Sequence, residues 1–443
     1  MSDRSSTVSF YTLGCRVNQY ESDAVSAELK RRGVTVVPFG EPADLTVVNT
    51  CTVTAESDHK SRQIIRRAAQ TAARVAVVGC YAQIDGETAA GQENVVYVSG
   101  NGGKGTLADT ILSLLDETYT GPVLAVTPPT DQATADMVLA SPQRTRPYIK
   151  IEDGCNNRCA YCLINRARGP VRSKSPDAVL AEAAALADQG AREIILTRIE
   201  TASYGLDFAE RRPYGHYLAD LLEAVSRIDG IRRIGLGSLD PSVMSDYFVE
   251  KVAALPKVLP HFHLSIQSGS SRTLAAMRRR YNADMAIAAV ERMRRARPDV
   301  TFSADVITGF PGETDEDFAE TVDFCRAVRF LHLHLFPYSK RAGTEAASLP
   351  DQVPESVKHE RLAVLEAEDE AIRRKLLLRY VEDHRDRPIE LLVEKCIGGL
   401  SSGHSEHFVE IRGVPKRSAI GEIVPVLLTD TDGKTVTGVP FLS

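Results

Sequence analysis

Short apolar segments alternate with helix-like segments along most of this 443-residue chain, and this alternation restricts the fold more than any other feature. Near the N-terminus, strands are expected at 8–13, 44–49 and 74–79, with helices at 21–32 and up to Arg67 between them. Strands that alternate with helices form a parallel sheet covered on both faces. The sequence therefore predicts an N-terminal parallel α/β domain.

The same rhythm returns at Tyr148 and continues for almost two hundred residues. Six strands are expected, at 148–152, 193–197, 232–237, 263–267, 302–308 and 331–337, with helices such as 176–188 and 283–297 between them. Six units are too few for a closed eight-stranded barrel, but they suit a partial (β/α)6 barrel. Catalytic groups should lie at the carboxyl ends of its strands.

The sequence pattern changes again after a helical, basic segment at 366–380. Short strands at 389–393, 407–411 and 423–428 are separated by Gly, Ser and Asp turns, which is typical of a small β-barrel. A proline-containing segment with little periodicity precedes Tyr148 and is interpreted as a linker. We therefore divide the chain into an N-terminal domain at 5–118, a linker at 119–144, a core at 145–375 and a C-terminal barrel at 376–443.

Composition indicates an ordinary globular protein, with 43% hydrophobic and 25% charged residues. No apolar run approaches the roughly 20 residues of a membrane span, and the first residues lack a signal-peptide core. A cytoplasmic location is expected, so the eight cysteines are interpreted as metal ligands or buried thiols rather than disulfides. The net charge of −6 argues against non-specific coating of nucleic acid. Arginine runs at 278–280, 292–295 and 373–375 are each interpreted as solvated helix faces.

Three cysteines lie within eight residues, at Cys155, Cys159 and Cys162, in a C-x3-C-x2-C spacing. Three thiolates on one loop can hold three irons of a 4Fe–4S cluster and leave the fourth iron open for reaction. Zinc is the main rival, but zinc sites usually pair cysteines as C-x2-4-C with a second pair or histidines nearby. The polar loop disfavours the remaining alternative of three buried cysteines without a ligand.

Three further cysteines, Cys15, Cys51 and Cys80, each follow one of the strands expected in the N-terminal domain. Functional groups of parallel sheets gather outside the carboxyl ends of the strands. One such cysteine would more often be a buried thiol, but three in the same topological position predict a second three-cysteine cluster. Cys325 and Cys396 fall outside both triads and are interpreted as packing residues.

These cysteine motifs carry a family resemblance that spans the whole chain. The C-x3-C-x2-C loop resembles the signature of radical S-adenosylmethionine (SAM) enzymes. Residues 12–22 around Cys15, together with 49–54 and Gly79-Cys80, resemble the N-terminal domain of the radical SAM methylthiotransferases. The amino-acid sequence of these motifs is most similar to that of the branch that methylthiolates threonylcarbamoyladenosine in tRNA. The resemblance implies a flavodoxin-like N-terminal domain, a partial radical SAM barrel and a TRAM-like barrel, the module with which this family binds RNA.

The resemblance also implies a reaction that uses SAM and two 4Fe–4S clusters. The reduced core cluster would cleave SAM to methionine and a 5′-deoxyadenosyl radical, which takes hydrogen from the target carbon. The cluster on Cys15, Cys51 and Cys80 would supply sulfur, methylated by a second SAM. The product would carry a methylthio group on C2 of the adenine of N6-threonylcarbamoyladenosine. The implied partners are tRNA, a reducing electron donor and a sulfur source, with no membrane and a monomer expected.

Several residues outside the triads are expected to bind the cofactor. They are Tyr161, Arg168, Glu200, Gln267, Gly309 and Glu313. Gln267 and Gly309 stand at strand ends near which the family holds the adenine and ribose of SAM. Arg168 belongs to an arginine segment suited to the SAM carboxylate or a substrate phosphate. For the glycine, a turn that merely requires this residue is the alternative.

Several residues close to the expected site differ from those that are common in the family. Arg198 and Glu200 replace the common Gly and His/Asn, and Asn165-Arg166 and Ser270 also differ. Arg198 and Glu200 are expected at the rim where SAM and substrate meet, and a surface ion pair worth at most roughly 1 kcal/mol is the alternative. Two other functions remain open. One is a methylthiotransferase that acts on a protein or peptide, and the other is a non-catalytic iron–sulfur protein that binds RNA or acts as a sensor.

Overall fold

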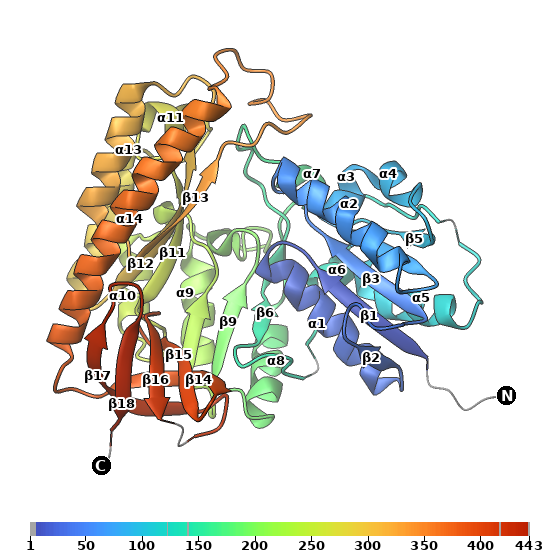
Figure 1. Cartoon of the computed structure of the whole chain (residues 1–443), viewed down its shortest axis with the longest axis horizontal. Coiled ribbons are helices and arrows are strands. Elements are labelled where there is room, and N and C mark those ends of the chain that lie inside the picture. The colour runs from blue at the N-terminus through green and yellow to red at the C-terminus, as the bar shows by residue number, and fades with distance from the viewer. Residues whose placement is uncertain (1–5, 122, 140, 416–417, 442–443) are drawn as a thin grey trace.

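The computed structural model describes residues 6–121, 123–139, 141–415 and 418–441. Its N-terminal part is a five-stranded parallel sheet in the order β2-β1-β3-β4-β5 (Figure 1). The strands are β1 (Thr7–Thr12), β2 (Thr35–Val37), β3 (Leu45–Thr50), β4 (Val75–Gly79) and β5 (Val95–Val98). The three strands predicted from the sequence are β1, β3 and β4, which lie side by side in the sheet.

Helices cover both faces of this sheet because successive side chains of a strand point to opposite sides. Val47 and Val78 pack on one face with residues of the first and fifth helices, whereas Val48 and Val77 pack on the other with the second. The helices are α1 (Arg16–Arg31), α2 (Ala55–Ala69), α3 (Cys80–Ile84), α4 (Gly86–Ala90) and α5 (Leu107–Leu115), with a 3-10 turn η1 (Lys104–Thr106) before α5. The predicted flavodoxin-like architecture is confirmed.

The core contains six parallel strands that form two short sheets, β6-β9-β10 and β11-β12-β13. A single bridge between Leu239 and Leu264 links the two sheets. The strands are β6 (Tyr148–Lys150), β9 (Glu193–Thr197), β10 (Arg233–Leu236), β11 (His261–Gln267), β12 (Thr301–Thr308) and β13 (His332–Pro337). The partial barrel is confirmed, and its open side faces the N-terminal domain, where α1 packs against β6 (Figure 1).

Helices on the outside of the core begin at recognisable caps. Ser175 accepts a hydrogen bond from Ala178 N and is followed by Pro176, and Thr314 forms a capping box with Asp317. The core helices are α7 (Ile164–Arg168), α8 (Pro176–Asp188), α9 (His216–Ser226), α10 (Asp246–Ala253), α11 (Ser271–Ala276), α12 (Ala283–Ala296) and α13 (Asp315–Val328). Smaller elements are α6 (Gln132–Ala135), η2 (Thr201–Ser203), η3 (Pro241–Val243) and the hairpin of β7 (Glu152–Asp153) with β8 (Arg172–Ser173).

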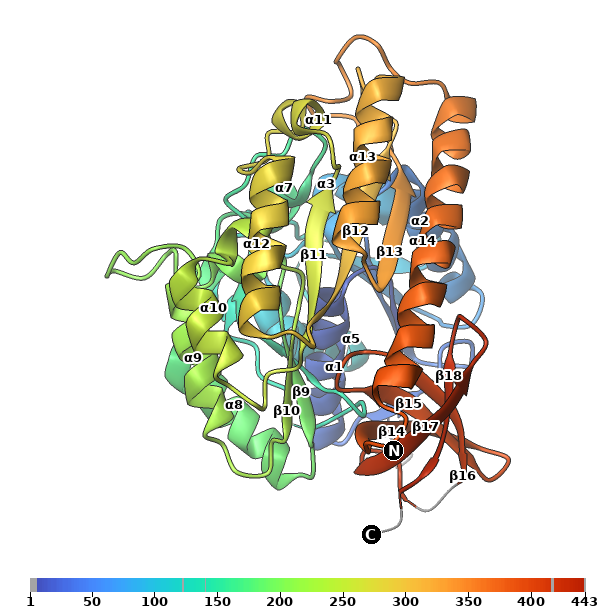
Figure 2. The same ribbon diagram turned by 90° about the vertical axis from the view of Figure 1, so that its left-hand side faces the viewer.

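The C-terminal part is a closed five-stranded barrel in the order β14-β15-β16-β18-β17. Its strands are β14 (Ile389–Ile397), β15 (Leu400–Ser405), β16 (Glu410–Pro415), β17 (Ile423–Thr431) and β18 (Val436–Pro440). The predicted barrel is confirmed, although the sequence did not indicate β15 and β18. Helix α14 (Glu355–Asp383) runs along the core and ends at the barrel, where Leu377 and Val381 join the barrel's apolar core (Figure 2).

Within the described residues, no helix is both long enough and apolar enough to cross a membrane.

Candidate active site

The three N-terminal cysteines follow three neighbouring strands of one parallel sheet. Cys15 caps α1 after β1, Cys51 directly follows β3, and Cys80 is the first residue of α3 after β4. The turn before Cys15 is tight, because Gly14 has φ +91° and a Cβ atom there would lie 2.7 Å from Cys51 Sγ. Only glycine permits this approach, so Cys51 packs beside the residue that precedes Cys15.

The core cysteines lie on one loop that leaves β7, and each thiol accepts a hydrogen bond from an N–H group. Asn157 N donates to Cys155 Sγ and Ile164 N donates to Cys162 Sγ, each at 3.4 Å. The third donor comes from another part of the core, because Arg279 Nη1 lies 3.4 Å from Cys159 Sγ. Donors directed at sulfur suit thiolates, which carry negative charge.

The surroundings raise the pKa of two of the core thiols, Cys155 and Cys162. Burial raises the pKa of Cys155 to about 12. Cys162 has exposed surface, yet reduced hydration among the surrounding atoms also raises its pKa to about 12, and Cys159 and Cys80 add smaller effects of the same sign. A metal that coordinates a thiol removes its proton. Helix α3, which begins at Cys80, packs against α7, which begins two residues after Cys162, so these two cysteines lie on adjoining segments across the domain interface.

Within the described parts of the chain, no three His, Cys, Asp or Glu side chains converge closely enough to hold a metal ion. The chemistry of the surroundings nevertheless fits thiolate ligands, because Asn101 Nδ2 donates to Cys80 Sγ at 3.3 Å and the N–H donors of the core loop point at its sulfur atoms. The residues present thus suit the predicted iron–sulfur clusters.

Arg168 lies away from solvent at the interface between the two α/β parts, with Nη1 and Nη2 engaged and Nε buried without a hydrogen-bond partner among the described residues. It forms ion pairs with Glu21 and Asp153, each at 2.9 Å, and a hydrogen bond with Asn18. Burial by itself would lower the pKa of Arg168. The negative charges of Glu21 and Asp153 outweigh this effect and hold the pKa well above its usual value. These contacts place Arg168 in the interface, and its predicted pairing with SAM stays a prediction.

Tyr161 and the ends of β11 and β12 surround the core loop. The Tyr161 ring meets Phe310 edge-on at 6.5 Å between centroids, and burial raises its pKa well above the usual value. Gln267 ends β11 in a left-handed conformation with φ +72°. Gly309 N donates to Glu313 Oε1 at 2.8 Å, and the same oxygen accepts from Arg361 of α14 at 2.7 Å. Glu313 therefore joins the end of β12 to α14.

Arg198 and Glu200 are buried, so the alternative of a surface ion pair is wrong. Arg198 Nη1 pairs with Glu152 Oε2, and Glu200 Oε1 accepts from the backbone N–H of Asp240 at 3.1 Å. The cause is tertiary, because β7 places a buried carboxylate opposite the end of β9. Burial raises the pKa of Glu152 to about 8 and also raises the pKa of Glu200. Nε and Nη2 of Arg198 are buried and have no hydrogen-bond partner among the described residues.

Sequence reasoning missed Arg279, which it placed on a solvated helix face. Its side chain is buried, and Nη2 donates to Asp240 Oδ2 at 3.1 Å and to Ser265 O at 2.9 Å. The chain turns inward at Arg278, whose φ is +60°, and no sequence signal marks that turn.

The other residues that differ from the family's usual ones contact the core cysteine loop or segments next to it. Asn165 Nδ2 donates to Cys155 O at 2.6 Å, Arg166 reaches Gly343 O, and Ser270 Oγ donates to Asp317. Asn165 thus supports the backbone of Cys155 directly. As predicted, Cys325 packs in the core and Cys396 beside the barrel interior.

Comparison with known proteins agrees with this architecture. Residues 149–325 match the family described as "Radical SAM superfamily", and residues 7–100 match "Uncharacterized protein family UPF0004". Threonylcarbamoyladenosine tRNA methylthiotransferase MtaB of Bacillus subtilis is 36% identical over 95% of this chain and 93% of its own. The protein of the same name from Aquifex aeolicus is 34% identical over 95% of this chain and 100% of its own.

Proteins with other names extend the similarity. The tRNA-2-methylthio-N(6)-dimethylallyladenosine synthase of Mycobacteroides abscessus is 36% identical over 86% of this chain and 76% of its own. Among solved structures, the radical S-adenosylmethionine methyltransferase TsrM from Kitasatospora setae has a similar fold, with a TM-score of 0.57 at 16% identity over 78% of this chain and 77% of that one. The two cysteine triads, the fold and the identity over nearly the full length place this protein in the radical SAM methylthiotransferase family, as an enzyme that uses SAM and 4Fe–4S clusters.

Proposed function

We propose that this protein adds a methylthio group to C2 of the adenine of N6-threonylcarbamoyladenosine, next to the anticodon of tRNA. SAM serves both as the radical source and as the methyl donor. The observation that carries the proposal is the match to relatives named for this nucleoside, which extends over 93% and 100% of their length. The similarity therefore covers the N-terminal domain, the core and the barrel together.

Cys155, Cys159 and Cys162 would hold the cluster that supplies reductive cleavage of SAM when bound. The chain's own contribution is to orient these ligands and to exclude water. Asn157, Ile164 and Arg279 donate hydrogen bonds to the three sulfur atoms. Ala160 beside the cysteines packs with Met277 and Phe310, an apolar group that keeps water from this side of the loop.

Cys15, Cys51 and Cys80 would hold the second cluster, which supplies sulfur. The packing of α3, which begins at Cys80, against α7, which begins two residues after Cys162, supports a site shared between the two triads. An enzyme that activates a carbon at one group and adds sulfur to it from another needs both groups at one substrate position.

The SAM and nucleotide subsites would lie along the interior face of β11, β12 and β13. Gln267 and Gly309 stand at the carboxyl ends of these strands, where barrel enzymes bind substrates. The same face carries polar side chains farther down, including His263, which pairs with Asp305 at 3.1 Å, and His334 next to it. Such groups offer hydrogen bonds to a nucleotide. Glu200 would meet the amino group of SAM, and Tyr161 would line its site.

Bulk tRNA from a strain that lacks this protein provides the test, by mass spectrometry of its nucleosides. We expect the methylthiolated form of threonylcarbamoyladenosine to disappear and the unmodified form to accumulate. The wild-type protein should restore the product, whereas a Cys159→Ala variant should not. Unchanged nucleosides would overturn the tRNA assignment and favour a protein or peptide substrate. Failure of the purified protein to form 5′-deoxyadenosine would instead favour a non-catalytic iron–sulfur protein. An electron donor and a sulfur source complete the proposed cytoplasmic system, with the enzyme as a monomer.

A further inference from the structure

We propose that Arg168, which belongs to the core, is a positioning residue for the N-terminal cysteine triad and raises the reduction potential of the cluster held there. This inference rests on the proposed function, in particular on a cluster bound by Cys15, Cys51 and Cys80. It assigns to Arg168 a role in the neighbouring domain, on the far side of the interface from the loop that carries it.

Helix α7 lies between the core triad and Cys80 of the N-terminal triad. It begins two residues after Cys162 and ends at Arg168, and it packs against α3, whose first residue is Cys80 (Figure 1). The Arg168 side chain is fully buried and points toward α1 of the N-terminal domain, where it bonds Asn18 and Glu21. A residue close to the core loop therefore contacts the helix that follows Cys15.

Two asparagines that bond the C-terminal end of α7 also support the cysteines. Asn18 bonds backbone carbonyls beside Cys15 and Cys51, and Asn101 bonds the sulfur of Cys80. Asn18, which accepts from Arg168, donates through Nδ2 to Leu13 O at 2.8 Å and to Thr50 O at 2.9 Å. These carbonyls lie in the turns that carry Cys15 and Cys51. On the other side, Asn101 Nδ2 donates both to Ala167 O at 2.8 Å and to Cys80 Sγ at 3.3 Å. The last two residues of α7 thus contact the supports of all three cysteines.

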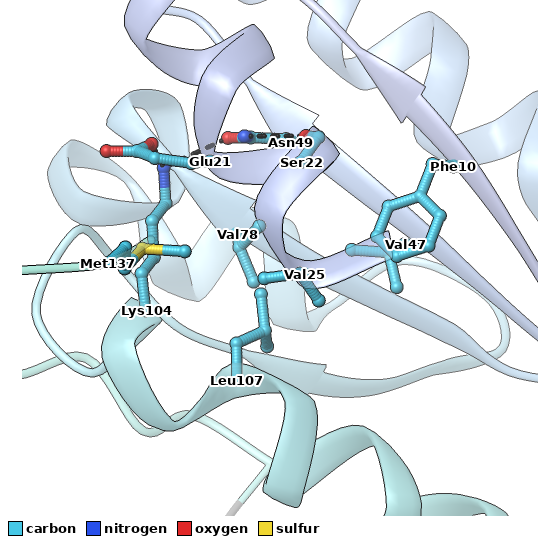
Figure 3. A pocket seen from close by; sticks show the side chains of 10 residues that line it. All are labelled: Phe10, Glu21, Ser22, Val25, Val47, Asn49, Val78, Lys104, Leu107 and Met137. Atoms are coloured by element: carbon cyan, nitrogen blue, oxygen red, sulfur yellow. Dashed lines mark hydrogen bonds and ion pairs between the residues drawn. The ribbon is translucent and has the colours of Figure 1, made fainter. Parts of the chain in front are cut away.

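The charges around Arg168 leave an excess of positive charge inside the protein. Four buried cations, Arg168, Arg172, Lys104 and Lys150, share two carboxylates, those of Glu21 and Asp153. Figure 3 shows Lys104 directed toward Glu21 beside a cavity of about 10 Å³, which is room for at most one water molecule. Bulk solvent therefore does little to screen these charges.

This excess charge acts on the cysteines. Arg168 donates to Asn18, which bonds the Leu13 carbonyl beside the turn that carries Cys15, and α7 packs against α3, which begins at Cys80. A fixed cation stabilises whichever state of a neighbouring group is more negative. Reduction adds an electron to a cluster, so Arg168 should favour the reduced state, and hydrogen bonds to the sulfurs act in the same direction.

The test measures the reduction potential of the N-terminal cluster by EPR-monitored titration. The full-length protein carries Cys155→Ala, Cys159→Ala and Cys162→Ala, so that only one cluster forms after anaerobic reconstitution. In this background Arg168→Gln should shift the reduction equilibrium at least tenfold against the reduced state, which is ~59 mV for a one-electron couple. Arg168→Lys, which retains the charge, should recover most of the potential.

Lys174→Met is the matched control, because Lys174 is also a buried cation but contacts Glu182, Tyr20 and Met137 instead of the triad's supports. It should lower the melting temperature without moving the potential. If Arg168→Gln fails to fold, Asn101→Ala removes the bond to Cys80 without removing a charge and should give a smaller shift in the same direction.

The possible results separate this inference from the proposed function. An unchanged potential in the folded Arg168→Gln protein, or in Asn101→Ala when that variant replaces it, overturns the role of Arg168 but leaves the cluster assignment intact. An equal shift in Lys174→Met also overturns it, because the effect would then be general destabilisation. Absence of any iron–sulfur absorption in the triple-alanine background overturns both proposals.

Discussion

The two cysteine triads differ in how the chain assembles them. The core triad lies within one loop, from Cys155 to Cys162, and two of its three sulfur-directed donors come from the same stretch of chain. The N-terminal triad takes one cysteine from the end of each of three strands and depends on sheet order to bring them to one edge. Local backbone therefore organises the first triad, whereas tertiary structure organises the second.

The supports of the triads differ in the same way. Among the described residues, Arg279 is the one donor to the core sulfurs that comes from a distant segment of the same domain. The N-terminal triad is supported by Arg168 and the carbonyl of Ala167, which belong to the other domain. Changes at the interface should consequently affect the N-terminal triad more than the core triad.

The largest expected effect comes from Cys159→Ala, which should abolish SAM cleavage. The wild-type protein should contain about eight irons after anaerobic reconstitution, and the variant about four, because each triad implies one 4Fe–4S cluster. Iron analysis and 5′-deoxyadenosine formation measure both effects. Cys325→Ala, which alters a buried thiol outside the triads, is the control and should retain both clusters. Deoxyadenosine from the Cys159→Ala protein would show that the cleaving site lies elsewhere.

Cys51→Ala should separate the two triads. The variant should lose about four irons and all methylthiolated product, yet continue to cleave SAM, because the core loop keeps its own ligands and donors. Nucleoside analysis of a tRNA substrate, measured alongside deoxyadenosine, distinguishes the two activities. Sulfur insertion by a protein without the N-terminal cluster would contradict the division of labour between the triads.

Glu152 should make stability depend on pH at the base of the core loop. Its pKa is about 8 in the folded protein and about 4.5 when unfolded, so the native state holds the extra proton between these values. Stability from this residue is therefore lost as pH rises from about 5 to 8, by up to about 1.4 kcal/mol per unit. Urea unfolding of Glu152→Gln should show a flatter pH profile. Parallel profiles for the variant and the wild type would mean that Glu152 does not hold this proton.

The smallest effect is expected from Arg198→Met, which removes the partner of Glu152 while keeping a side chain of similar length. Leaving a buried polar group without its hydrogen bond should cost roughly 1–3 kcal/mol of unfolding free energy. The reduction potential of the N-terminal cluster should not change, since the ion pairs of Arg198 among the described residues are with Glu152 and Glu200 of the core. A loss below a few tenths of a kcal/mol would indicate that the pair contributes nothing to the loop's support.

The sequence by itself determined the order of the strands along the chain and the place of each cysteine within it. Apolar periodicity located all six core strands to within two residues, and the C-x3-C-x2-C loop was readable because its three ligands are contiguous. The triad at Cys15, Cys51 and Cys80 could be inferred as well, since parallel strands present their carboxyl ends at one edge.

Only the tertiary structure decided the partners of the buried charges. Arg168, Arg198 and Arg279 each looked suited to a ligand or to solvent, but each lies inside the protein against a carboxylate from a distant segment. The physical reason is that a side chain's charge is a local property, whereas its burial and its partner depend on which elements pack together. An arginine's function therefore cannot be assigned until the opposing surface is known.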